Sequence, residues 1–218
     1  MKLSSESFRF LIPGILLFIL IGLMTIAIDH VLLSYLLIAV TLYIFIILFF
    51  FRDPDRSVPD NPRALVSPAD GRVIAVDENI PDYFRGSKKR VSIFLSMLDV
   101  HINRVPVDGK INRVDHRSGR FRAAFTEKAA LENEHTIIEI ENSYGKIGFC
   151  QRAGMIARRI VCNLKDGQTV QRGERFGMIR FGSRVDLYLP ENVSISVSKG
   201  ARVTGGETVI GEFSANES

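Results

Sequence analysis

Three short segments of the sequence carry side chains that could take part in catalysis. The segment RFGSRVDLYLP contains the pair Gly182-Ser183. SPADG contains Asp70, and DVHINRVP contains His101. A serine hydroxyl becomes a useful nucleophile when a nearby base removes its proton, and a histidine of ordinary pKa suits that task. Each residue also has a plain structural explanation, because Gly-Ser and Asp-Gly pairs form turns and a single histidine is often a packed structural residue.

The rest of the sequence offers fewer candidates. It contains no HExxH, P-loop, GxSxG or dinucleotide fingerprint. The other histidines are His30, His116 and His135, in positions typical of a turn, a surface and the entry to a strand. Cys150 and Cys162 lie 12 positions apart without a CxxC pattern, which suits core positions in a reducing compartment.

Two long apolar runs precede these segments. Residues 8–28 contain one charge, Arg9, and residues 31–51 contain none. Each run is 21 residues long, enough for a helix to cross a hydrocarbon core of ~30 Å. Only two residues separate the runs, and no small-residue cleavage site precedes the second, so residues 1–51 are predicted to form a membrane hairpin rather than a signal peptide.

The basic residues around the hairpin predict its orientation. Lys2 and Arg9 lie at its start, Arg52, Arg56 and Arg63 follow it, and the connecting turn has neither lysine nor arginine. The positive-inside tendency places both ends in the cytoplasm, at the inner membrane. The net charge of +4 falls after residue 51, which favours contact with anionic lipid, and we expect no nucleic-acid partner.

Composition predicts a linker and then a mainly β domain. Residues 52–66 are rich in proline and charge, which disfavours both helix and central strand. Residues 67–218 contain runs of β-forming residues such as RVIAVDE, TIIEIEN and KIGFCQ between Gly, Asp and Asn. FTEKAALENEH is the one short candidate for a helix.

Internal repeats refine this fold prediction. Residues 68–77 and 106–115 share the pattern P-x-D-G-[RK]-[VI]-x-x-V-D, and residues 166–177 resemble residues 199–211. Each unit is typical of two strands joined by a glycine turn. Repetition of such units predicts a pseudo-symmetric β sandwich or barrel-like domain.

The order of four segments resembles a known enzyme family. SPADG, DVHINRVP, GKIGFCQRAGMIARRI and RFGSRVDLYLP, in this order behind an apolar hairpin, resemble the phosphatidylserine decarboxylases. The pattern is similar to the short form of that family and covers essentially all of residues 52–213. The ordered set is specific, whereas the Gly-Ser pair alone would be a weak signal.

This resemblance implies a precursor that cleaves itself between Gly182 and Ser183. The Ser183 hydroxyl attacks the Gly182 carbonyl, the resulting ester is eliminated, and loss of ammonia leaves a pyruvoyl group at position 183. His101 is then the base that activates the hydroxyl, and Asp70 orients and charges the imidazole, as in a Ser-His-Asp triad. The products are a large chain of residues 1–182 and a small chain of residues 183–218.

The resemblance also implies the cofactor and the substrate. The pyruvoyl group derived from Ser183 forms a Schiff base with the amine of phosphatidylserine in the bilayer and takes up the electrons left by decarboxylation, the task that pyridoxal phosphate performs elsewhere. Phosphatidylethanolamine is the product. Neither a metal nor pyridoxal phosphate is expected.

One position departs from the family pattern. Larger relatives carry an H-x-x-H arrangement, whereas this chain has His101-Ile-Asn-Arg104. Arg104 cannot act as the base because its guanidinium stays protonated. We expect it to hold the phosphate or carboxylate of the substrate. Either His101 serves both self-cleavage and decarboxylation, or another group replaces the second imidazole.

Two other functions fit parts of the sequence. Repeated G-x-x-V-x-x-G-E corners behind a membrane anchor also resemble lipoyl-like modules of non-enzymatic adaptor proteins, although a carrier lysine has no clear counterpart. A soluble pyruvoyl decarboxylase of free amino acids is disfavoured by the two apolar spans. The sequence leaves the oligomeric state open, a homo-oligomer included.

Overall fold

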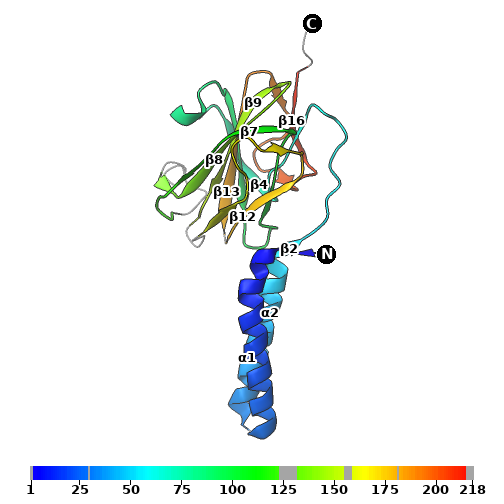
Figure 1. Ribbon diagram of the computed structural model, residues 1–218, viewed down its shortest axis with the longest axis vertical. Coiled ribbons are helices and arrows are strands. Elements are labelled where there is room, and N and C mark those ends of the chain that lie inside the picture. The colour runs from blue at the N-terminus through cyan, green and yellow to red at the C-terminus, as the bar shows by residue number, and fades with distance from the viewer. Residues whose placement is uncertain (1, 29, 123–131, 155–158, 181, 215–218) are drawn as a thin grey trace. The chain divides into compact units, whose positions relative to one another are not determined.

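The structure, a computed structural model, describes residues 2–28, 30–122, 132–154, 159–180 and 182–214. The chain divides into two compact units, Met1–Asp55 and Arg56–Ser218. Figure 1 gives the course of the chain and the labels of its elements.

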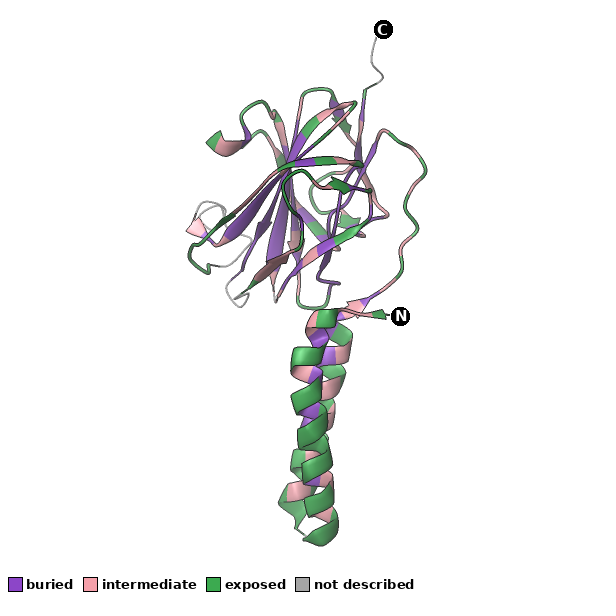
Figure 2. Ribbon diagram, viewed as in Figure 1, coloured by how far each residue is buried: buried purple, intermediate pink, exposed green. Residues whose placement is uncertain are grey.

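The first unit is a helical hairpin. Helix α1 spans Phe8–Ala27 and helix α2 spans Val31–Phe50, so each ends one residue before the predicted span. A short 3-10 helix η1 (Ser5–Ser7) precedes α1, and strand β1 (Lys2–Leu3) pairs with β2 (Arg52–Asp53). Both helices are long and apolar enough to cross a membrane. Most of their surface is exposed (Figure 2), which suits membrane association because lipid would then cover these apolar side chains.

The second unit is mainly β, as predicted. Its elements are β3 (Ala64–Val66), β4 (Gly71–Asp77), η2 (Asp82–Phe84), β5 (Lys89–Leu95), β6 (Ile102–Arg104), β7 (Gly109–Arg117), β8 (His135–Asn142), β9 (Gly145–Arg152), β10 (Ile160–Cys162), β11 (Thr169–Val170), β12 (Arg175–Ile179), β13 (Ser183–Leu189), β14 (Val193–Ile195), β15 (Arg202–Val203) and β16 (Val209–Phe213). The helix predicted in FTEKAALENEH lies largely outside the described residues, and its last residue, His135, begins β8.

Three sheets make up this unit. The large sheet has the strand order β11-β7-β8-β9-β13-β5-β4-β15, and two three-stranded sheets have the orders β10-β12-β6 and β14-β16-β3. Within the described residues the large sheet is open, with β11 and β15 at its two edges, so the barrel-like alternative is not what the chain builds. β13 pairs on both sides, with β9 and β5.

The sequence repeats occupy equivalent places at the two ends of the large sheet. β4 and β15 pair Gly71 with Val203, and β7 and β11 pair Gly109 with Val170. A Cβ atom at either glycine would collide with a carbonyl oxygen of the neighbouring strand, which explains why both repeats carry glycine here. The two small sheets also match strand for strand, and the predicted pseudo-symmetry is confirmed.

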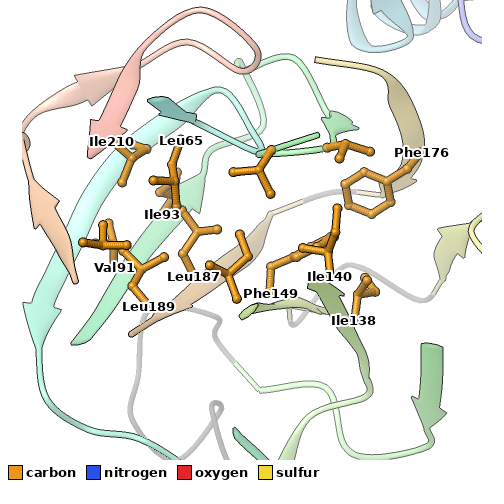
Figure 3. Close-up of a cluster of buried hydrophobic side chains, with 14 of the residues drawn as sticks. Leu65, Val91, Ile93, Ile138, Ile140, Phe149, Phe176, Leu187, Leu189 and Ile210 are labelled. Carbon is orange, nitrogen blue, oxygen red and sulfur yellow. The ribbon is translucent and has the colours of Figure 1, made fainter. Parts of the chain in front are cut away.

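The core lies between the large sheet and the two small ones. Strand β13 contributes Val185, Leu187 and Leu189, which alternate with polar residues along the strand. Leu187 and Leu189 pack against a large apolar cluster, whose members include Leu65, Val91, Ile93, Ile138, Ile140, Phe149, Phe176 and Ile210 (Figure 3). Removal of this apolar area from water is the main force that holds the sheets together.

The predicted linker is fixed to the second unit along part of its length. Its first two residues form β2 and its last three form β3. Between them, the guanidinium of Arg172 donates hydrogen bonds to the carbonyl oxygens of Pro59 (2.8 Å), Ala64 (2.9 Å) and Asn61. One half-buried arginine therefore supplies hydrogen bonds that the proline-rich backbone cannot make within a sheet.

Candidate active site

The candidate residues lie where several strands begin or end. Ser183 is the first residue of β13 and pairs with Leu95, the last residue of β5. His101 immediately precedes β6, and Asp70 immediately precedes β4. An apolar cluster of Ala69, Leu95, Ala153, Ile179 and Val185 joins these strand ends. The cluster contains neighbours of Asp70 and Ser183, so the fold gathers these segments into one corner.

The Gly182-Ser183 bond has the features that attack by a neighbouring hydroxyl requires. Gly182 has a φ of 57°, in the left-handed region that favours glycine. Ser183 is fully buried, and its Oγ has no hydrogen-bond partner among the residues that the structure describes. A buried hydroxyl without a partner costs ~1–3 kcal/mol. Such a group is unusual in a native core, and it suits a hydroxyl that is kept for reaction.

The ring of His101 is held by the main chain. The imidazole is fully buried, and its Nδ1 lies 2.9 Å from the carbonyl oxygen of Asp99. A carbonyl oxygen can only accept, so Nδ1 carries the proton in this hydrogen bond. In the neutral ring this tautomer puts the lone pair on Nε2, the atom with which a general base would take a proton.

A tight turn before His101 sets this geometry. The Asp99 carboxylate accepts hydrogen bonds from the Ser96 amide (2.8 Å) and the Ser96 hydroxyl (2.6 Å). Its other oxygen lies 3.1 Å from a guanidinium nitrogen of Arg202. No motif in the sequence points to a role for Asp99. The only available signal was its place two residues before His101, which allows a turn to present its carbonyl to the ring.

Asp70 lies between an arginine and a main-chain amide. Gly205 N–H donates to Asp70 Oδ1 (2.8 Å), and Arg56 donates to Asp70 Oδ2 (2.7 Å). The first contact repeats at the pseudo-symmetric corner, where Arg172 N–H donates to Asp108 Oδ1 (2.9 Å). The amide contact is therefore a structural feature of both repeats, whereas the Arg56 contact distinguishes Asp70. Arg56 belongs to the predicted linker, and nothing in the sequence indicated that it would reach Asp70.

Main-chain hydrogen bonds join the segment that precedes Asp70 to the segment that follows His101. Val66 N–H donates to Pro106 O and Arg104 N–H donates to Pro68 O, both at 2.9 Å. The chain bends at residues 68–70, and the Asp70 carboxylate lies near enough to Asp99, two residues before His101, for the negative charge of Asp99 to add to burial in raising the pKa of Asp70. The hydrogen bond that fixes Nδ1 comes from Asp99, so an orienting role for Asp70 stays a prediction.

Arg104 lies on the Asp70 side of this corner. It is buried, and one guanidinium nitrogen donates to Gly173 O (2.9 Å). Its Cδ would be 2.8 Å from a Cβ built at Gly206, the residue after the amide that binds Asp70. Arg104 and Arg56 therefore both border Gly206. The role of Arg104 in binding a substrate anion stays a prediction.

Removal of Arg56 should change the pH dependence of any reaction that needs ionised Asp70. Burial raises the pKa of Asp70 above its usual value and nearby Asp99 adds to this, while the Gly205 amide and Arg56 oppose it. Arg56→Ala removes one opposing group, so the pKa of Asp70 rises further and the carboxylate forms only at higher pH. We expect the rising limb of the self-cleavage rate against pH to move to higher pH.

This prediction has two comparison variants. Arg56→Lys keeps the charge and should restore most of the wild-type profile, and Arg63→Ala removes an arginine from the same segment. The measurement is the rate of precursor cleavage from pH 5 to pH 9. A uniform slowing of Arg56→Ala at all pH values would contradict the electrostatic role, because a purely structural defect has no pH signature.

A second buried charge network lies on the other face of β13. Asp186 accepts hydrogen bonds from Arg152 Nε (2.7 Å) and Arg184 Nε (2.5 Å), and all three side chains are almost completely buried. Arg152 also donates to the hydroxyls of Tyr83 (2.6 Å) and Tyr188 (3.0 Å). Burial alone would raise the pKa of Asp186, but Arg184 and Arg152 lower it to about 2. This network anchors the strand that begins at Ser183.

Replacing Asp186 by alanine should destabilise the second unit. Two buried guanidinium groups would lose their counter-charge, and breaking such a pair costs ~3–5 kcal/mol. Because its pKa is depressed, ionised Asp186 stabilises the fold above the ordinary carboxyl pKa, and this contribution is lost as pH falls toward 2. Urea denaturation of the uncleaved precursor measures the loss.

Asp115→Ala is the matched control for this measurement. Asp115 also binds two arginines, Arg113 and Arg117, but its side chain is 35% exposed. Exposed ion pairs contribute less than ~1 kcal/mol, so this variant should lose little stability. Equal losses of unfolding free energy in the two variants would show that burial of the Asp186 network does not add to stability.

Comparison with known proteins identifies the family of this chain. The family model "Phosphatidylserine decarboxylase" matches residues 44–211, which include Asp70, His101 and Ser183. The phosphatidylserine decarboxylase proenzyme of Desulfotalea psychrophila is 48% identical over 76% of this chain and 78% of its own length. Proenzymes of the same name from Chlorobaculum parvum (43% identical over 80% of this chain and 81% of that protein) and Wolbachia pipientis wMel (49%, over 74% and 73%) are also similar. These matches favour an enzyme over an adaptor module, and they show that the chain belongs to the phosphatidylserine decarboxylase family of carboxy-lyases.

Proposed function

We propose that this chain is a precursor that cleaves itself between Gly182 and Ser183 and then converts phosphatidylserine to phosphatidylethanolamine. The observation that carries the proposal is the Gly182-Ser183 bond itself. A glycine in the left-handed region precedes a fully buried serine hydroxyl that has no hydrogen-bond partner in the described part of the chain. Strands on both sides of β13 hold this bond in place.

The cleavage follows from the groups at this corner. His101 Nε2 takes the proton of the Ser183 hydroxyl, whose oxygen attacks the Gly182 carbonyl carbon and replaces the amide by an ester. Removal of the Ser183 Cα proton then expels the Gly182 carboxylate and leaves a dehydroalanine. Its enamine tautomerises to an imine, and addition of one water releases ammonia and leaves a ketone. No oxidant or reductant is needed.

The residues fit a pyruvoyl group at position 183. The group would form at the first residue of β13, against Leu95 of β5 and beside the apolar cluster that contains Ala153 and Val185. When present, a pyruvoyl group supplies the electron sink that decarboxylation of an amino acid requires. In this proposal His101 returns a proton to the α carbon after carbon dioxide leaves. Arg104 and Arg56 supply positive charge for the carboxylate or phosphate of the substrate.

The first unit suits a lipid substrate. Its two apolar helices indicate membrane association, so the site would be held near the headgroups of the bilayer. We place the second unit on the cytoplasmic face of the inner membrane, because the lysines and arginines flank the hairpin and are absent from its turn.

Mass spectrometry of the purified protein under denaturing conditions tests this proposal. We expect two chains, residues 1–182 and residues 183–218, the second with an amino terminus that resists Edman degradation because a ketone replaces the amine. The chains should stay associated without a disulfide, since the small chain contains no cysteine. Borohydride added with substrate should label the small chain and abolish activity. An active enzyme that is one intact chain with unmodified Ser183 would overturn the proposal.

A further inference from the structure

Two adjacent apolar side chains project from the turn between β5 and β6. Met97 is 49% exposed and Leu98 is 71% exposed. The other exposed large apolar residues in the described part of the second unit, Val58, Val76 and Phe121, are separated from one another in the sequence. Single exposed apolar residues are common on soluble domains, but an adjacent exposed pair at the tip of a turn needs a reason.

The turn that carries the pair is held firmly. Asp99 N–H donates to Ser96 O (3.1 Å), and the Asp99 carboxylate accepts both the amide and the hydroxyl of Ser96. These bonds close the backbone around residues 97 and 98, so both side chains are held in an exposed position. Arg202, whose side chain is 69% exposed, binds the same carboxylate and adds a cation beside the apolar tip.

The same turn joins the two groups proposed to react. Leu95, two residues before Met97, pairs with Ser183. His101, three residues after Leu98, is held through the carbonyl oxygen of Asp99. The apolar tip is therefore close along the chain to both groups and not on a distant surface.

We propose that Met97 and Leu98 insert into the lipid layer and bring the candidate site to the headgroup of its lipid substrate. This inference rests on the proposed function. A bilayer is favoured over a protein partner because the tip combines apolar side chains with an exposed arginine, as interfacial segments do, and because apolar helices already associate this chain with a membrane. The inserted leucine and methionine would lie among the acyl chains while Arg202 meets the phosphates.

A tryptophan at position 98 gives a direct test, because the chain contains no tryptophan of its own. The full-length Leu98→Trp variant is reconstituted into vesicles of phosphatidylcholine and phosphatidylserine, with and without bromine on the acyl chains. We expect a blue-shifted emission that brominated lipid quenches. Val76→Trp is the matched control, since Val76 is exposed on β4 and pairs with Val91, at the end of β5 away from Ser183. Its emission should show little quenching.

Activity gives a second, independent readout. Leu98→Asn should lower kcat/KM on phosphatidylserine vesicles by about tenfold or more, because burial of a leucine side chain changes an equilibrium constant by roughly one to two powers of ten. The loss should be much smaller with dihexanoyl phosphatidylserine dissolved as monomers. Self-cleavage, which involves no lipid, should go to completion.

Several results would overturn the inference. One is emission of Leu98→Trp that brominated lipid does not quench, including a blue shift without quenching, which would indicate contact with a second copy of the chain. Another is an equal loss of activity on vesicles and on the monomeric lipid. Failure of the proposed function gives a different result, namely wild-type protein that decarboxylates neither substrate.

Discussion

The Ser183→Ala variant is expected to stay a single chain of full length and to have no decarboxylase activity. The variant lacks both the nucleophile for cleavage and the oxygen that leaves in the elimination, so neither the new chain end nor its ketone can form. Because the hydroxyl is buried without a partner in the described structure, its removal should not destabilise the fold. Denaturing mass spectrometry and release of carbon dioxide from phosphatidylserine measure the two effects.

Two further variants make this result specific. Ser183→Cys should cleave slowly, since a thiol can also make the acyl shift. Ser194→Ala removes an exposed serine from β14 of the same small chain, and it should cleave and act as the wild type does. Cleavage of Ser183→Ala at the same bond would contradict the role of this hydroxyl.

The second large effect is expected for His101→Ala. Without the imidazole, the Ser183 hydroxyl lacks its base, and general-base catalysis typically contributes about 10²–10⁴-fold to a rate. The precursor should therefore accumulate after synthesis, as a gel or mass spectrum taken over time would show. His116→Ala is the control, because His116 is exposed on β7 and binds Thr136. Normal maturation of His101→Ala would exclude His101 as the base.

Asp70 and Asp108 provide a matched pair for the same experiment. Each accepts a main-chain N–H at an equivalent corner, so replacement by alanine removes the same structural hydrogen bond from both. Only Asp70 also binds Arg56 and adjoins the His101 segment. We expect Asp70→Ala to slow cleavage and Asp108→Ala to mature normally. Slow cleavage of Asp108→Ala and normal cleavage of Asp70→Ala would show that the site belongs to the repeat of Asp108 and not to that of Asp70.

Features that are repeated or local could be predicted from the sequence. The two helices follow from uninterrupted apolar runs, and the pseudo-symmetric sheets follow from the repeated Asp-Gly units, in which Gly71 and Gly109 allow the same close approach of strands. Ser183 and His101 could be proposed because their segments resemble a family in a fixed order. The closed barrel could not be excluded, because the pairing of the edge strands β11 and β15 is too short to leave a pattern.

Contacts between distant parts of the chain could not be predicted. Arg56 lies 14 residues before the Asp70 that it binds, and it looked like one more charge in a linker. The Asp186 network needs residues from β9, β13 and η2 to meet, and each looked like an ordinary charged or aromatic residue in a strand or turn. The orienting contact of His101 is a main-chain carbonyl, a group that every residue carries.

Because β13 lies between β9 and β5 in the large sheet, self-cleavage changes how the unfolded protein can refold. In the precursor, β13 is tethered to β12, so it finds its place between β9 and β5 at a high effective concentration. After cleavage the same strand belongs to a separate polypeptide, and once the protein has unfolded the strand can return only by a second-order encounter with the large chain. The precursor should thus refold when denaturant is diluted, whereas the mature enzyme should not. The lifetime of the folded mature enzyme then depends on a slow rate of unfolding. The cleaved protein keeps a structure that its separated chains could not readily rebuild.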